Sequence, residues 1–408
     1  MKKANKCSFC GNPKEAVAIL IEGKDAFICE NCVAQAQKIV DEALTPNTPK
    51  FDFNLSKNTK PKEIAAFLDQ YIIGQDNAKK TLSVAVYNHY KRLNQKIDDD
   101  VEIEKSNILL VGETGTGKTL LARSIAKFLN VPFAIVDATV FTEAGYVGED
   151  VESILSRLLQ SCNYDVASAE KGIVYIDEID KISRKGDNPS LTRDVSGEGV
   201  QQAMLKLLEG TEVLVPPHGG RKHPEQKLIK VNTRNVLFIC GGALDGISRI
   251  ISSRLQSQAI GFKNSFSRKN VDKENFLQYV SPLDIRRFGL IPELIGRLPV
   301  VTHLNPLDKE ALLAILTQPK NALIKQYQKL FALEGVKLEF SKDALDFIVD
   351  KAYDFKLGAR GLRSICETIM TDIMFELPSD KDVKYFIITE EVCREKANKE
   401  KLEQLKAA

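Results

Sequence analysis

The chain has 408 residues, of which 43% are hydrophobic and 27% charged, and its formal net charge is +2 at pH 7. This length allows two or three domains, the composition is ordinary for a soluble globular protein, and the charge argues against a broad electrostatic nucleic-acid surface. Residues 1–5 lack the apolar segment of a signal peptide, and no stretch reaches the length of a membrane span. We therefore expect a cytoplasmic protein without a membrane partner.

Four of the eight cysteines lie in the first 32 residues, as two C-x-x-C pairs separated by 18 residues: Cys7 and Cys10, then Cys29 and Cys32. This spacing predicts a structural zinc site, because each tight turn aims two thiolates at one tetrahedral ion. Two disulfides or a redox dithiol are the alternatives. A reducing cytoplasm disfavours the first, and the absence of a βαβ pattern disfavours the second. No ligand spacing connects the other four, which are Cys162, Cys240, Cys366 and Cys393.

Four segments follow one another along the chain. Residues 1–44 form the zinc module, and residues 45–62 are a polar, proline-bearing linker. Residues 63–304 alternate short apolar runs with amphipathic helical patterns, which predicts a parallel α/β sheet. Strands are expected at residues 108–111, 131–136, 173–176, 236–240 and 300–304. Residues 305–408 form a smaller, mostly helical domain, where Ser341 is expected to cap a helix with the apolar stripe Leu345, Ile348, Val349 and Ala352.

Residues 112–119 read GETGTGKT, follow the first apolar run and open a helical pattern. Gly115 and Gly117 let the backbone approach phosphate oxygens, and the amide groups at the helix N-terminus face an anion. Lys118 is placed to reach the β- and γ-phosphates, and the Thr119 hydroxyl to reach Mg²⁺. The alternative is a glycine-rich strand–helix turn without a ligand. Strand, turn, Lys-Thr pair and helix all occur together, so the sequence predicts nucleoside triphosphate binding.

The apolar run at residues 173–176 ends in two acids, Asp177 and Glu178. Beside the phosphate loop, Asp177 can hold Mg²⁺ through its water shell, and Glu178 can polarise the attacking water. The alternative is a strand that merely ends in solvated acids, which the phosphate loop disfavours. The adjacent glutamate favours ATPase over GTPase chemistry, and the chain has no Asn-Lys-x-Asp guanine motif.

Between these motifs lies Gly145-Tyr146-Val147-Gly148, which predicts either a mobile loop with an apolar tip or a β-turn with a half-buried tyrosine. The cysteine pairs, GETGTGKT, GYVG, IDEID, the run TRDVSGEG, Gly296-Arg297 and Gly358-Ala-Arg-Gly361 occur in the order of the ClpX family. The chain resembles this family of AAA+ unfoldases over nearly its whole length. Its relative HslU lacks the zinc module, so the cysteines separate the two.

The resemblance implies an AAA+ fold of the α/β class: a P-loop parallel sheet with helices on both faces, a mainly helical small domain and a treble-clef-like zinc module. It implies an ATPase that unfolds tagged proteins and threads them through the pore of a homohexamer into the ClpP peptidase, with adaptor proteins as further partners and no nucleic acid. The implied cofactors are ATP, Zn²⁺ and Mg²⁺, the last held by Thr119 and Asp177.

Residue roles follow from the same resemblance. Arg297 resembles the arginine finger that reaches a neighbouring subunit's nucleotide, and Arg360 resembles the sensor-2 arginine of the small domain. Residues 72–75 resemble the segment that packs on adenine. The implied nucleotide contacts are Ile73, Gly74, Gly112, Glu113, Thr114, Gly115, Thr116, Gly117, Lys118, Thr119 and Leu120.

Protein contacts are implied as well. The implied pore residues, which meet the substrate, are Tyr146, Val147, Arg193, Val195, Arg221, Lys222 and His223. The implied peptidase-docking residues are Ile260, Gly261 and Phe262. Two positions depart from the family pattern. Glu113 stands where proline is more common, and Gly241-Gly242 stand where a polar sensor-1 side chain is expected.

A zinc-bearing AAA+ motor acting on DNA is the main alternative function. It predicts a basic groove or a DNA-reading domain, and the net charge of +2 and the lack of a helix-turn-helix pattern count against it. A non-catalytic zinc adaptor is contradicted by the complete pair Asp177-Glu178.

Overall fold

The computed structural model describes residues 6–24, 26–44, 59–95, 101, 103–142, 148–184, 197–216, 228–257, 272, 275–356, 358–379 and 382–397. The chain forms two compact units, residues 1–50 and 51–408, and each is described by itself. Among the described helices, none combines the length and the apolar character that a bilayer crossing requires.

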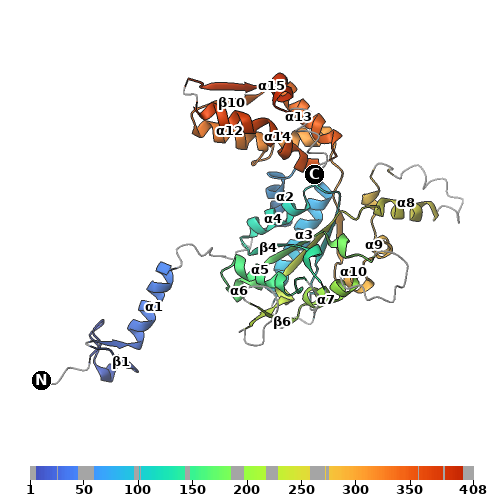
Figure 1. Cartoon of the computed structure of the whole chain (residues 1–408). Helices are drawn as coiled ribbons and strands as arrows, with labels where there is room; N and C mark the ends of the chain where they lie inside the picture. Colours follow the sequence, from blue (N-terminus) through green and yellow to red (C-terminus); the bar gives the residue numbers. More distant parts are fainter. Residues whose placement is uncertain are drawn as a thin grey trace. The chain divides into compact units, whose positions relative to one another are not determined.

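The first unit consists of a short 3₁₀ turn, a hairpin and one helix (Figure 1). After η1 (Lys14–Ala16), strand β1 (Leu20–Glu22) pairs antiparallel with β2 (Phe27–Cys29), and α1 (Glu30–Leu44) follows directly. The Glu30 carboxylate accepts hydrogen bonds from the backbone N–H groups of Ala18 and Ile19, at 3.0 and 3.1 Å. Among the side chains described in this unit, the buried apolar ones are Cys7 and Cys29 alone, so its fold depends on the cysteine site and not on an apolar core.

A five-stranded parallel sheet organises the second unit. Its strand order is β4 (Phe133–Asp137), β5 (Ile173–Asp177), β8 (Leu237–Gly242), β3 (Ile108–Val111) and β9 (Val300–His303). The five predicted strands are confirmed, with shifted ends. Strand β4 begins at Phe133 and not at Val131, because Pro132 has no N–H to donate to the ladder.

Alternate residues of the strands belong to two different cores, one on each face of the sheet. In β3, Leu109 and Val111 belong to one core, whereas Ile108 and Leu110 belong to the other. The helices of the first face are α5 (Ser153–Ser161), α7 (Glu198–Glu209), α8 (Ile247–Ser257), α9 (Pro282–Phe288) and α10 (Pro292–Gly296). Those of the second face are α2 (Pro61–Asp69), α3 (Asp76–Leu93) and α4 (Lys118–Leu129). Both faces are therefore covered (Figure 1), which explains why all residues of β3 and β8 are buried.

Shorter elements decorate this sheet without joining it. They are η2 (Ala138–Val140), α6 (Val166–Ala169), η3 (Ile179–Ile182), η4 (Thr233–Asn235), η6 (Phe276–Tyr279) and the antiparallel pair β6 (Glu212–Val215) and β7 (Ile229–Asn232).

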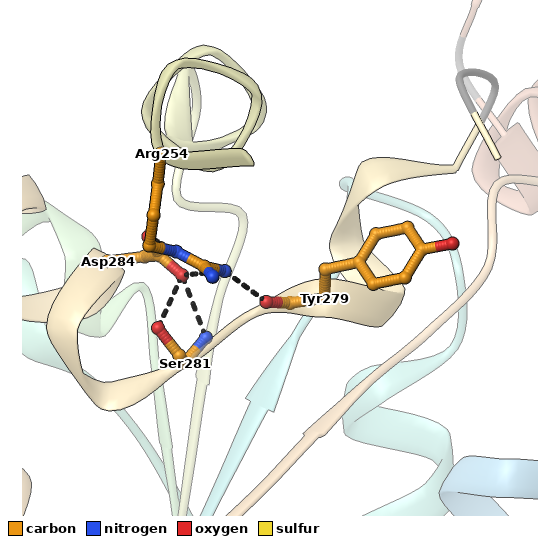
Figure 2. A network of polar contacts seen from close by, with 4 residues as sticks. All are labelled: Arg254, Tyr279, Ser281 and Asp284. Carbon is orange, nitrogen blue, oxygen red and sulfur yellow. Dashed lines mark hydrogen bonds and ion pairs between the residues drawn. The ribbon is translucent and has the colours of Figure 1, made fainter. Parts of the chain in front are cut away.

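Arg254 fastens the last turns of α8 to the start of α9 (Figure 2). Its guanidinium donates to both Asp284 oxygens at 2.8 and 2.9 Å and to the Tyr279 carbonyl at 2.7 Å. Asp284 Oδ2 also accepts from the N–H and the hydroxyl of Ser281, at 3.0 and 2.6 Å. Burial raises the pKa of Asp284, but the hydrogen bonds from Arg254 and Ser281 outweigh it, so the pKa lies below its ordinary value.

The C-terminal part has a core of its own. It contains α11 (Lys309–Thr317), α12 (Leu323–Leu333), α13 (Lys342–Asp354), α14 (Gly358–Glu376), η7 (Leu377–Ser379) and α15 (Glu390–Lys396), with a parallel pair of short strands, β10 (Lys337–Phe340) and β11 (Tyr385–Ile388). The predicted helix cap is confirmed, because the Ser341 hydroxyl accepts from Ala344 N–H at 3.2 Å. Of the predicted stripe, Leu345 is only partly buried, whereas Ile348, Val349 and Ala352 are fully buried.

The cysteines outside the first unit are free, buried thiols: Cys162, Cys240, Cys366 and Cys393. Burial raises the pKa of Cys162 to about 11 and that of the other three to about 12, so all four stay protonated at neutral pH.

Candidate nucleotide and zinc sites

The four cysteine sulfurs of the first unit converge on one point. All lie within 4.8 Å of one another, with 3.8 Å between the sulfurs of Cys7 and Cys32 and 3.6 Å between those of Cys10 and Cys29. A tetrahedron with Zn–S bonds of about 2.3 Å has S–S edges of about 3.8 Å, so the residues fit a zinc ion. Burial raises the pKa of Cys7, but hydrogen bonds from the backbone of Cys10, Phe9 and Cys29 outweigh it and lower the pKa to about 6. Burial and the neighbouring sulfurs raise the pKa of Cys32 to about 12, so zinc binding at this cluster would release protons.

The loop between β3 and α4 has the geometry of a phosphate cradle. Gly115 and Gly117 adopt φ values of 84° and 104°, which an L side chain rarely adopts, and Gly117 directly precedes the first turn of α4. Gly112 lies so close to the end of β9 that an added Cβ would be 2.9 Å from Leu304 Cβ. The Thr116 hydroxyl donates to Glu113 O at 2.8 Å, which closes the loop on itself.

Lys118 points back into this loop and donates to the carbonyls of Gly112 and Glu113, at 2.5 and 2.9 Å. Burial lowers the pKa of Lys118, Asp177 and Asp180 oppose that shift, and Arg360 adds to it. The ammonium is thus held inside the loop by two backbone carbonyls, where it can reach a phosphate in the cradle. Glu113 contributes its backbone oxygen, so its side chain does not disturb the loop.

Two predicted magnesium ligands meet where the start of α4 lies beside the carboxyl end of β5. Thr119, in the first turn of α4, donates its hydroxyl hydrogen to Asp177 Oδ2, at the end of β5, over 3.1 Å. A hydroxyl and a carboxylate oxygen are ligands that Mg²⁺ accepts, directly or through water, so these residues fit the ion. Glu178 follows with φ 55° and an exposed side chain, next to the site and open to water.

The predicted adenine segment, residues 72–75, lies between α2 and α3. Ile72 is buried, Ile73 is half-buried, and Gly74 and Gln75 both have φ of 60°. Gln70, which follows α2 just before this segment, is linked to the C-terminal part, because Lys320 N–H donates to Gln70 O at 2.9 Å. Leu120, the last residue of the predicted nucleotide set, is 47% exposed on α4.

The start of α14 packs directly on the phosphate loop. Ala359 N–H donates to Gly115 O at 3.3 Å, and a Cβ on Gly358 would lie 3.2 Å from Thr114 O. Arg360 is exposed there and its charge acts on Lys118. The structure therefore brings Arg360 to the nucleotide site of its own chain.

Arg297 lies elsewhere. It follows α10, and its guanidinium donates to Glu209 Oε1 at 2.8 and 3.2 Å. Glu209 is the last residue of α7, so the guanidinium pairs away from the phosphate loop. The side chain is 52% exposed, so it is accessible to another molecule.

Three family models match this chain in succession. They are the ClpX C4-type zinc finger at residues 5–42, the AAA domain (Cdc48 subfamily) at residues 103–301, and the C-terminal D2-small domain of ClpB protein at residues 307–389. The ATP-dependent Clp protease ATP-binding subunit ClpX of Bacteroides thetaiotaomicron is 61% identical over 408 residues, which cover 98% of this chain and 99% of that protein. The chain belongs to the ClpX family.

Two further ClpX proteins with the same descriptive name are equally similar. The protein of Bacteroides fragilis is 60% identical over 407 residues, covering 99% of this chain and 98% of its own length. That of Porphyromonas gingivalis is 62% identical over 383 residues, covering 93% of each chain. Membership of the ClpX family confirms the AAA+ fold, the ATPase activity and the need for ATP, Mg²⁺ and Zn²⁺. The comparisons give no support to a DNA motor.

Some residues expected to contact protein partners lie outside the described residues. They are Tyr146, Val147, Arg193, Val195, Arg221, Lys222, His223, Ile260, Gly261 and Phe262. Their roles stay predictions that rest on the resemblance to the ClpX family.

Two side chains at the nucleotide site were not predicted from the sequence. Tyr175 Oη donates to Asp177 Oδ1 at 3.1 Å, and Asp180 Oδ1 accepts from Ala243 N–H at 3.1 Å. The signal for Tyr175 was present, because residues two apart on a strand share a face. These two side chains also explain why Gly241 and Gly242 stand where a polar sensor-1 side chain was expected. A Cβ on Gly241 would lie 2.0 Å from Tyr175 Oη, and a Cβ on Gly242 would lie 2.7 Å from Asp180 Oδ1.

Proposed function

We propose that this chain is an ATP-dependent protein unfoldase that works as the ATP-binding subunit of a Clp protease. The observation that carries the proposal is the convergence of Lys118, Thr119 and Asp177 in one site. That site belongs to a chain that is 60–61% identical to two Bacteroides ClpX proteins over nearly the full length of each. The domains proposed are a zinc module at 1–44, a linker at 45–62, a large ATPase domain at 63–304 and a small domain at 305–408.

Within the nucleotide site, each residue has a distinct task. Lys118 and the loop amides hold the β- and γ-phosphates, while Thr119 and Asp177 hold the magnesium ion. Bound Mg²⁺ neutralises charge on the phosphate oxygens. Glu178 accepts a proton from the attacking water, for which its exposed position beside Asp177 is suited.

Two arginines would supply further positive charge. Arg360 acts within its own chain, as its electrostatic effect on Lys118 supports. Arg297 acts on the nucleotide of a neighbouring subunit in a homohexamer, and its exposure and its pairing with Glu209 instead of the phosphate loop support that role. Hydrolysis would then depend on assembly.

The remaining residues would transmit the motion to proteins. Tyr146 and Val147, with Arg193 and Val195, grip the substrate in the central pore, and residues 221–223 meet incoming tags. The tripeptide at 260–262 docks on the ClpP peptidase. The Arg254–Asp284 network holds α8 against the start of α9 (Figure 2). Adaptor proteins and a cytoplasmic location are part of the same proposal.

The decisive experiment is ATP-dependent degradation of a folded, tagged reporter with the cognate peptidase. Tyr146→Ala should keep ATPase activity and lose unfolding, because the substitution removes a contact with the substrate and leaves the nucleotide site unchanged. Deletion of residues 260–262 should keep ATPase activity and unfolding and lose degradation alone, since an Ile and a Phe side chain contribute roughly 1.5–3 kcal/mol each when a partner buries them. ATPase stimulation by DNA and not by the tagged protein would instead support a DNA motor.

A further inference from the structure

The carboxylate of Asp177 is held by three donors that treat its two oxygens differently. Oδ1 accepts from Tyr175 Oη at 3.1 Å and from Glu178 N–H at 3.0 Å. Oδ2 accepts from Thr119 Oγ1 at 3.1 Å. Oδ1 thus accepts two hydrogen bonds from the protein, and Oδ2 faces Thr119, the other predicted magnesium ligand. Without the phenol, Oδ1 would keep one donor, and the carboxylate could rotate about its Cβ–Cγ bond more freely.

We propose that Tyr175 is a positioning residue of the ATPase site, which orients Asp177 so that Oδ2 and the Thr119 hydroxyl face Mg²⁺ together. The inference rests on the proposed function and extends it to a residue that does not itself contact the nucleotide. Residues that hydrogen-bond to a metal ligand, and not to the metal, tune metal affinity by fixing the orientation of that ligand.

The buried setting of Tyr175 restricts what its hydroxyl can do. The side chain is 0% exposed in the middle of β5. A phenol has an ordinary pKa of about 10, so it is protonated at neutral pH and can donate to Asp177. A protonated buried phenol needs an acceptor, and Asp177 provides it.

Strand β8 has the residue that makes this arrangement sterically feasible. It lies beside β5, with Tyr175 opposite Ile239 and Ile176 opposite Cys240. Gly241 follows Cys240 on β8. A Cβ on Gly241 would lie 2.0 Å from Tyr175 Oη and 2.8 Å from Tyr175 Cζ. Any other residue at position 241 would displace the hydroxyl from Asp177. We therefore infer that position 241 is glycine, and not a polar sensor-1 residue, because only glycine leaves room for the Tyr175 hydroxyl.

The test is binding of a fluorescent ATP analogue to the full-length protein, measured in EDTA and across a Mg²⁺ series, with ATPase rates in the same series. Tyr175→Phe removes one oxygen atom. We expect the affinity of this variant for the ATP analogue in EDTA to match that of the wild type. Its half-saturating Mg²⁺ concentration should rise about 10-fold, the lower end of the range for residues that orient a metal ligand.

Tyr90→Phe is the matched control. Tyr90 is also 0% exposed, and its hydroxyl donates to Lys171 O at 3.0 Å, on another part of the fold. It should change thermal stability without changing the Mg²⁺ dependence. Gly241→Ala keeps the phenol but displaces it, so it should reproduce the Mg²⁺ shift and serves as the test if Tyr175→Phe does not fold.

An unchanged half-saturating Mg²⁺ concentration in a folded Tyr175→Phe or Gly241→Ala protein overturns the inference and makes the phenol a structural group alone. That outcome leaves the proposed function standing, provided that the wild type still degrades the tagged reporter. A wild type without ATPase activity overturns the proposed function itself.

Discussion

The side-chain amide of Gln75 and the backbone of Asn305 form two hydrogen bonds with each other. Gln75 Nε2 donates to Asn305 O at 2.9 Å, and Asn305 N–H donates to Gln75 Oε1 at 2.7 Å. Gln75 ends the predicted adenine segment, and Asn305 lies in the connection from β9 to α11. The pair therefore joins the nucleotide side of the sheet to the chain segment that leads into the C-terminal part.

Replacing Gln75 by glutamate tests this pair. The variant places a carboxylate oxygen opposite the Asn305 carbonyl, in a position that is 6% exposed in the wild type. We expect the free energy of unfolding to fall by about 1–3 kcal/mol, the cost of an unsatisfied buried polar group. Urea denaturation measures it, with the exposed Gln256→Glu as the control, expected within about 0.5 kcal/mol of the wild type. Equal midpoints for wild type and Gln75→Glu would show that the pair contributes nothing.

Glu178→Gln should abolish most hydrolysis while nucleotide binding stays intact. The amide keeps the shape of the side chain but cannot accept the proton of water, and general bases contribute about 10²–10⁴-fold. Phosphate release and binding of a fluorescent ATP analogue should be measured on the same sample. The exposed Glu310→Gln on α11 is the control. A turnover comparable to that of the wild type would remove Glu178 from the mechanism.

The first unit should contain one Zn²⁺ per chain and unfold when the metal is removed. Its described residues bury no apolar side chain except Cys7 and Cys29, so little else stabilises it. Metal analysis of freshly purified, reduced protein should give one zinc per chain, and strong chelation should remove the helical signal of α1 while ATPase activity persists. Purified protein free of zinc would contradict this prediction.

Arg297→Ala should nearly stop hydrolysis without unfolding the protein, because an exposed ion pair contributes only about 0–1 kcal/mol. Mixed with Lys118→Ala subunits, it should regain part of the activity, since some interfaces then combine an intact Lys118 with an intact Arg297. Glu209→Gln is the control: it breaks the same ion pair but keeps the arginine, so it should remain active. Mixed rings that form without any rescue would argue against action between subunits.

Asp284→Asn should lower the free energy of unfolding by roughly 3–5 kcal/mol, the cost of leaving a buried charge unpaired. Asp284 is fully buried and Arg254 is 16% exposed. Because the folded-state pKa of Asp284 is lowered, its stabilisation is present above the ordinary carboxyl value of about 3.9 and is lost as the pH falls through the folded value. The difference between wild type and variant in urea denaturation should therefore shrink below about pH 4, and a difference independent of pH would contradict the assignment.

Features that depend on neighbouring residues could be predicted from the amino-acid sequence alone. The period of apolar residues located the five strands of the sheet, the serine at 341 marked a helix start, and the cysteine spacing predicted the convergence of four sulfurs. The phosphate loop and the two acids at the end of β5 could be predicted for the same reason. In each, the chemistry lies within a few consecutive residues, whose conformation short-range sterics and hydrogen bonding largely decide.

Contacts between distant residues could not be predicted in this way. The strands β10 and β11 were missed because each has four residues and is stable only through pairing with the other. The contact of Gly358 with the phosphate loop, the pairing of Arg297 with Glu209 and the fit of Gly241 against Tyr175 join segments far apart in the chain. Such contacts follow from how the sheet and its helices pack, and no local pattern contains that information.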